Sequence, residues 1–164
     1  MSKQIITIDY KNSFKVSLRY SFIITLIFVA IFAIALLFHL VKFTELRFIN
    51  YIFVFIVCYE AIKKVYTENN YYIEYFNGLM IGILTATFGQ LWYSILFYIY
   101  LNIDSNFLNY LLTEMPRDIV APKFSITVLL LLEGFGLSPI ISLGLMQYFK
   151  SKQGRWARTH HSAS

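Results

Sequence analysis

The sequence is poor in charged residues and in cysteine. Only 14% of its 164 residues are Asp, Glu, Lys or Arg, whereas soluble domains usually carry about 25%. The one cysteine, Cys58, excludes a disulfide within the chain and leaves the redox compartment open. A low charge content combined with long apolar runs excludes an ordinary soluble domain, because a chain of this length cannot bury all of that apolar surface.

Short catalytic and cofactor motifs are also missing. The sequence contains no G-x-S-x-G, H-E-x-x-H, C-x-x-C or G-x-x-x-x-G-K. No cluster of histidines with carboxylates indicates a metal or haem site, so we expect no metal and no cofactor. Despite a formal charge of +5, no basic stripe stands clear of the apolar runs, which argues against a nucleic-acid partner. We therefore expect a protein that is not an enzyme.

Hydrophobic residues make up 58% of the chain and gather in long runs. The first run has no formal charge, and at about 1.5 Å per residue it would span roughly 31 Å, the thickness of a bilayer core. The second is weaker, because Glu45 and Arg47 must reach back toward the lipid headgroups. We predict an all-α polytopic membrane protein, with four transmembrane helices in an antiparallel up-down bundle over residues 21–152. The predicted spans are 21–41, 44–62, 76–101 and 124–149.

A short amphipathic helix is predicted between the last two spans. Asp104 or Ser105 can cap its start and Pro116 can end it. We expect this helix to lie on the membrane surface, with an irregular loop as the alternative. Its apolar residues recur at helical spacing: Phe107, Leu108, Leu111, Leu112 and Met115.

Lys and Arg residues are distributed unevenly between the two sides of this predicted domain. Basic segments flank it at 1–20 and 153–164. Because the cytoplasmic side of a membrane protein is enriched in Lys and Arg, we expect both termini in the cytoplasm. The basic side holds Lys3, Lys11, Lys15, Arg19, Lys63, Lys64, Lys150, Lys152, Arg155 and Arg158, and the opposite side holds Lys42, Arg47, Arg117 and Lys123.

The third span carries the clearest family-like pattern. It begins Tyr72-Ile73-Glu74-Tyr75-Phe76-Asn77-Gly78, continues through Gly82 and ends Phe97-Tyr98-Ile99-Tyr100, followed by Ile103-Asp104 and Phe107. With Ala61-Ile62-Lys63-Lys64 closing the second span and Phe149-Lys150 closing the last, residues 21–152 resemble the domain-of-unknown-function family 4199. The resemblance implies a small multi-pass protein of the bacterial inner membrane, and it supplies no assigned activity and no catalytic residues.

Three polar residues within the predicted spans are candidates for a functional role. Glu133 is a carboxyl inside the fourth span, where a charge costs about 2.5–3.5 kcal/mol, so it is expected to face the bundle as a proton or cation site or as a structural hydrogen-bond partner. Gln90 lies at nearly the same depth in the third span, and a Gln90–Glu133 bond would satisfy both; the alternative for each is a backbone carbonyl or a trapped water. His39 is expected at the membrane interface. At the inner end of the second span, Glu60 and Lys64 are spaced for a helical ion pair.

Small residues recur at four-residue steps on two of the spans. This spacing lets a second helix approach closely, and Pro139 beside the second stripe is expected to kink its helix. We expect the two stripes to pack on each other within one subunit, with self-association or docking on another membrane protein as alternatives. The stripes are Gly78, Gly82, Ala86 and Gly89 on the third span, and Gly134, Ser138 and Ser142 on the fourth.

Two functions remain open from the sequence. The first is a packing or accessory subunit without catalysis, whose partners are the lipid bilayer and either another membrane protein or a second copy. The alternative is an oligomeric proton- or ion-coupled transport protein that uses Glu133 and Gln90. The absence of catalytic motifs favours the first, and the intramembrane carboxyl favours the second.

Overall fold

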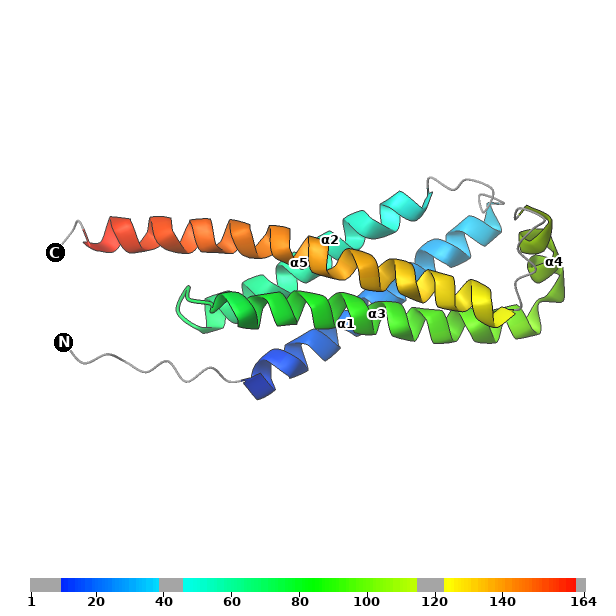
Figure 1. The fold of residues 1–164 in the computed structure, drawn as a ribbon, viewed down its shortest axis with the longest axis horizontal. Coiled ribbons are helices and arrows are strands. Elements are labelled where there is room, and N and C mark those ends of the chain that lie inside the picture. The colour runs from blue at the N-terminus through cyan, green and yellow to red at the C-terminus, as the bar shows by residue number, and fades with distance from the viewer. Residues whose placement is uncertain (1–9, 39–45, 115–122, 162–164) are drawn as a thin grey trace.

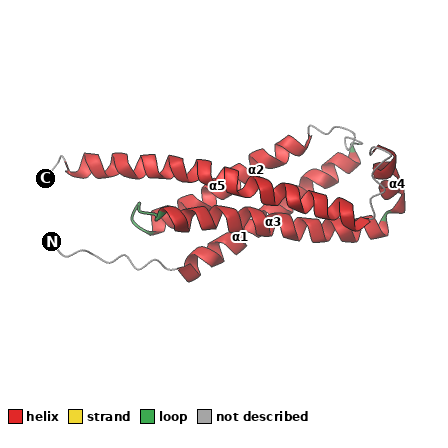
Figure 2. Cartoon of the chain, in the orientation of Figure 1, coloured by secondary structure: helices red, strands yellow, loops and turns green. Residues whose placement is uncertain are grey.

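The computed structural model describes residues 10–38, 46–114 and 123–161, and their side chains except those of residues 10, 46, 47, 110, 112–114 and 155–161. Within these ranges the chain is helical and contains no strand (Figure 2). The all-α prediction is therefore confirmed for the described part of the chain. The five helices are α1 (Tyr10–Leu37), α2 (Leu46–Glu68), α3 (Tyr75–Ile103), α4 (Ser105–Glu114) and α5 (Lys123–His161).

The four long helices alternate in direction along the chain, and α4 lies across the end where α3 finishes (Figure 1). The first residues of α1, the turn between α2 and α3, and the last turns of α5 lie at one end of the molecule. That turn reverses the chain at Asn70 and Tyr71, which both adopt left-handed backbone angles, with φ of 52° and 62°. The arrangement brings the basic ends of α1, α2 and α5 to one side, as the positive-inside argument requires.

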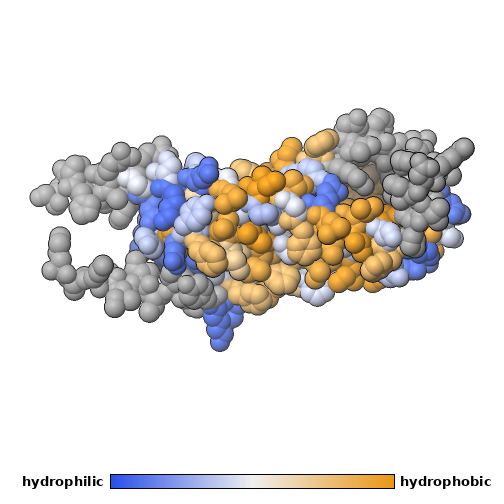
Figure 3. Space-filling model, in the orientation of Figure 1, coloured by the Kyte–Doolittle hydropathy of each residue, from blue (hydrophilic) through white to orange (hydrophobic). Residues whose placement is uncertain are grey.

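Three of the helices are long and apolar enough to cross a membrane. They are α1 from Lys11 to Leu37, α3 from Tyr75 to Ile103, and α5 from Lys123 to Gly154. The helix α2 forms, but Glu60, Lys63 and Lys64 in its second half make it too charged to join them. Hydrophobic side chains cover the middle of the visible face and hydrophilic ones gather toward its ends (Figure 3). The described residues therefore have membrane-protein character with three candidate spans, and a fourth span stays a prediction.

Helix ends extend well beyond the predicted spans. The helix α1 starts at Tyr10, inside the segment assigned from sequence to the basic N-terminal region, and α5 continues to His161, through most of the basic tail. The reason is that hydropathy marks where a helix is apolar, whereas Lys, Arg and Gln are good helix formers in water. The predicted spans thus mark where each helix is apolar, and the helices themselves extend farther.

The helix α3 is the centre of the packing, and α1, α2 and α5 all pack against it. The main core lies toward the end that holds the α2–α3 turn, where Tyr66 of α2 and Phe149 of α5 are fully buried with ring centroids 5.3 Å apart. A second, smaller cluster lies at the opposite end. It comprises Leu101, Phe107 and Ile126, with Phe32, Leu36, Phe97, Tyr100, Leu108 and Leu111 packed against it.

The predicted short helix is α4, and Asp104 is its cap. The carboxylate accepts hydrogen bonds from the backbone amide of Phe107 at 3.0 Å and from the hydroxyl of Tyr100 at 2.9 Å. These bonds hold the pKa of Asp104 below its ordinary value. Phe107 in turn packs edge-on against Phe32 and Tyr100, which fixes α4 against the ends of α1 and α3.

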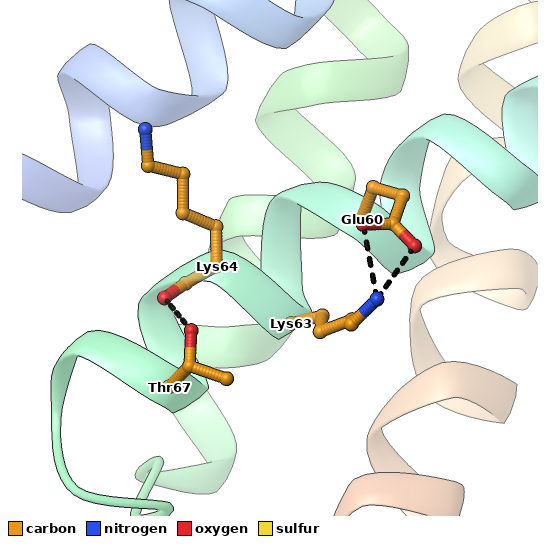
Figure 4. Close-up of polar contacts among 4 residues, drawn as sticks. All are labelled: Glu60, Lys63, Lys64 and Thr67. Carbon is orange, nitrogen blue, oxygen red and sulfur yellow. Dashed lines mark hydrogen bonds and ion pairs between the residues drawn. The ribbon is translucent and has the colours of Figure 1, made fainter.

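The ion pairs near the end of α2 differ from the predicted one. Lys63 Nζ lies 3.1 Å from Glu60 Oε1, three residues apart, while Lys64 extends to the other side of the helix (Figure 4). The long side chain of Lys64 instead approaches Glu68 at 3.9 Å. The predicted Glu60–Lys64 pair was therefore wrong, because a spacing of three residues also places two side chains on one face.

Candidate functional site

Two stripes of small residues form the seam between α3 and α5. A Cβ atom added to Gly78 would collide with the side chain of Met146, and one added to Gly82 would lie 2.9 Å from Ser142 Cβ. On the opposite side of the seam, a Cβ at Gly134 would lie 2.8 Å from Gln90 Cδ. The lack of side chains at these glycines thus lets the two helices approach closely.

The seam between α3 and α1 uses a further stripe that the sequence analysis missed. Gly89 faces α1, where an added Cβ would lie 2.8 Å from Ile24 Cγ2, so it does not share the α5-facing surface with Gly82. Thr25 Oγ1 donates to the carbonyl of Gly89 at 3.2 Å, and Ser17 Oγ donates to that of Ile81 at 3.4 Å. Four-residue spacing was the available signal for this stripe, which comprises Ser13, Ser17, Ser21 and Thr25, all buried.

Pro139 lies inside α5, and the neighbouring Ser138 compensates for it. Proline has no amide hydrogen, so the carbonyl of Phe135, four residues earlier, loses its usual helical partner. Ser138 Oγ donates to that carbonyl at 3.2 Å. The helix continues through the proline, and its axis changes direction gently about midway along its course (Figure 1).

A small polar cavity lies beside the α3–α5 seam, where α2 faces α5. Its volume is about 40 Å³, which is room for about two to three water molecules. Besides two tyrosines, its polar lining comes from Asn50 of α2, Gln90 of α3, and Glu133 and Ser138 of α5. The remaining wall is formed by Phe28, Tyr51, Val54, Ala86, Tyr93, Leu130, Gly134, Leu137 and Ile141. We call this the central polar cavity.

Gln90 and Glu133 both line the central polar cavity, but Gln90 bonds elsewhere. Its Nε2 donates to the backbone carbonyl of Leu130 at 2.9 Å, on the turn of α5 that precedes Glu133. This is the backbone alternative considered from the sequence in place of a Gln90–Glu133 bond. The two side chains thus share the wall of one cavity without a bond between them that the structure records.

Asn50 is the cavity residue that the sequence analysis missed. Its Oδ1 atom is buried and has no hydrogen-bond partner among the described residues. A buried acceptor without a donor costs about 1–3 kcal/mol unless water or an ion satisfies it. The only sign of Asn50 in the sequence is its position, because it is the one amide in the apolar run of residues 44–62.

The other predicted residues do not gather into a site. His39 lies outside the described residues, and among those described no group of three His, Cys, Asp or Glu side chains could hold a metal ion. No protein-family model, curated protein or solved structure matches the chain. The resemblance to family 4199 therefore stays a prediction, and the central polar cavity is the strongest candidate for a functional site.

Proposed function

We propose that this chain is a four-span membrane protein that binds a proton or a small cation at Glu133 and acts in proton- or ion-coupled transport. The observation that supports the proposal best is the central polar cavity, which gathers a carboxyl, a partnerless amide oxygen and two further polar side chains between apolar helices. In keeping with the resemblance, the proposed location is a bacterial inner membrane, with both termini in the cytoplasm.

The chemistry of the lining favours a positively charged occupant. Glu133 when ionised can accept, and so can the side-chain oxygens of Asn50, Gln90 and Ser138. Oxygen ligands suit small hard cations and hydrated protons. A cation held by these oxygens would balance the charge of an ionised Glu133 within the membrane.

An accessory role is the second candidate function. The structure gives it less support, because the small-residue stripes are not exposed to a partner. The small-residue stripes that suggested docking are covered within the chain, by α5 on one side of α3 and by α1 on the other. A partner protein would have to use other exposed apolar residues, and α2 offers one such group. These are Phe48, Ile49, Ile52, Phe55 and Ile56, and lipid can cover them equally well.

Flux measurements separate the two functions. The purified protein is reconstituted into vesicles, and proton uptake is followed by a pH-sensitive dye after imposing a proton, sodium or potassium gradient. The parent is expected to carry flux, and Glu133→Gln is expected to lower it at least about tenfold, because the amide keeps the shape but does not titrate.

Glu60→Gln serves as the matched control, since Glu60 is half-exposed and pairs with Lys63 at the end of α2. It should leave the flux unchanged. A parent that carries no flux under any of the three gradients, or a Glu133→Gln variant with parental flux, would refute the transport proposal and leave the accessory role.

The four-span topology has its own test, by reporter fusions. Fusions after Ser151 and between Thr67 and Asn70 are expected to report a cytoplasmic position, and fusions near Asn109 a periplasmic one, because the basic residues gather at the first two sites. If α2 does not cross, a fusion at the N-terminus will report the side opposite to Asn70 and Ser151, because α3 and α5 still place those two sites on one side.

A further inference from the structure

A second cavity lies between the first halves of α1 and α3, away from the central polar cavity. Its volume is about 220 Å³, smaller than the pockets that hold drug-sized ligands. Its lining comes from only two helices, which run in the same direction (Figure 1). We call it the α1–α3 groove; it is lined by Ser13, Phe14 and Ser17 of α1 and by Phe76, Asn77, Met80, Ile81 and Leu84 of α3.

The chemistry of the α1–α3 groove changes along its length. Both helices begin at the same end of the molecule, where α1 carries the exposed cations Lys11, Lys15 and Arg19 in its first turns. The polar groove residues Ser13 and Asn77 come next. Deeper in the groove the lining from α3 is apolar, and Ser17 of α1 donates its hydroxyl to the Ile81 carbonyl at 3.4 Å. This order of charge, polar group and apolar surface matches the order of a phospholipid's phosphate, ester carbonyls and acyl chain.

Asn77 gives the groove a specific polar anchor. Asn77 is only 4% exposed, and its side-chain amide lines the groove. A buried amide needs a partner, and an ester carbonyl at this depth would accept from its NH₂ group.

The start of α3 also favours an anion. The residue before the helix, Glu74, makes no side-chain cap bond, so no side chain occupies the first-turn amides, which attract phosphate groups. Two acidic residues lie at this end against the three cations of α1: the exposed Glu74, and Glu68, which accepts a hydrogen bond from Asn12 of α1 at 3.1 Å.

From these observations we propose that the α1–α3 groove binds one anionic phospholipid, with its acyl chain along Met80, Ile81 and Leu84, its ester region at Asn77, and its phosphate near the cations of α1. The site is distinct from the central polar cavity, because the two share no lining residue. The proposal therefore stands or falls independently of ion transport.

Lipid retention measured by native mass spectrometry tests the groove. The full chain is released from nanodiscs that contain equal amounts of phosphatidylglycerol and phosphatidylcholine, and the bound lipids are counted. The parent is expected to retain one phosphatidylglycerol. Met80→Trp, at a rim position that is 37% exposed, should fill the groove and lower retention at least about fivefold.

Ile95→Trp is the matched control, since Ile95 is 45% exposed on the same helix and does not line the groove. It should retain phosphatidylglycerol like the parent. Asn77→Leu should also lose the lipid, and thermal unfolding in detergent shows whether that variant is folded. Replacing Lys11 and Lys15 together by Gln should abolish the preference for phosphatidylglycerol over phosphatidylcholine.

Equal retention of phosphatidylglycerol by the parent, Met80→Trp and Ile95→Trp would overturn the proposal, since the lipid would then sit elsewhere. Equal retention of the two lipids by the parent would overturn its anionic specificity. If the ion-flux experiment fails and the parent still retains phosphatidylglycerol, the transport proposal is refuted and the lipid site is supported.

Discussion

The helix α5 meets its two neighbours in different ways. Against α3, glycine and serine let the backbones approach until Gly82 leaves no room for a side chain beside Ser142. Against α2, the contacts near one end are large rings, with the centroids of Tyr59 and Phe149 5.4 Å apart, and farther along the helices separate around the central polar cavity. Small residues thus give a seam that tolerates no change, whereas bulky and polar ones leave space that a ligand can use.

The largest effect is expected from closing the tight seam to a side chain. Gly82→Leu would force α3 and α5 apart, and overpacking of this kind costs about 1–3 kcal/mol or more. The variant should show a clearly lower unfolding temperature in detergent. Gly144→Leu is the control, because an added Cβ at Gly144 meets nothing within 4 Å.

If Gly82→Leu unfolds at the same temperature as Gly144→Leu, then α3 and α5 are not in close contact in the folded protein. The α3–α5 seam could then no longer be described as tighter than the α2–α5 seam.

A middle-sized effect is expected at Ser138, which lies on the tight seam beside Pro139. Ser138→Ala removes the donor to the Phe135 carbonyl, which the proline leaves without its helical partner, and should lower stability by about 1 kcal/mol. In a Pro139→Ala background the same substitution should cost much less, because the alanine that replaces the proline supplies the missing amide. Thermal unfolding of the four proteins forms a double-mutant cycle, and equal costs in both backgrounds would show that the hydroxyl does not replace the lost bond.

The sequence predicted the tight seam better than the open one. Spacing alone identified the α3 and α5 stripes, because small residues at four-residue steps need only helical geometry to lie on one face. It could not decide which neighbour Gly89 meets, since that depends on how α1 crosses α3. Nor could it find the central polar cavity, because Asn50 and Glu133 are 83 residues apart and their meeting depends on where α2 and α5 diverge. Helix ends were also misjudged, since charge ends a membrane span without ending a helix.

The smallest effect, and the most informative for the open seam, is expected at Asn50. Asn50→Leu keeps the branched arrangement of side-chain heavy atoms and removes a buried acceptor that has no partner among the described residues. In a buffer whose only cation is too large for a cavity of about 40 Å³, this change should therefore leave stability within about 1 kcal/mol of the parent, or raise it slightly. Adding the cation that the site prefers should stabilise the parent, because a ligand that binds only the folded state raises its unfolding temperature with concentration.

The Asn50→Leu variant should not show this cation-specific rise in unfolding temperature. It should show only the general effect of ionic strength, which a matched concentration series of the large cation measures. A variant that keeps the full rise would place the cation away from Asn50, and the open seam would then be a packing gap with no ligand to explain it.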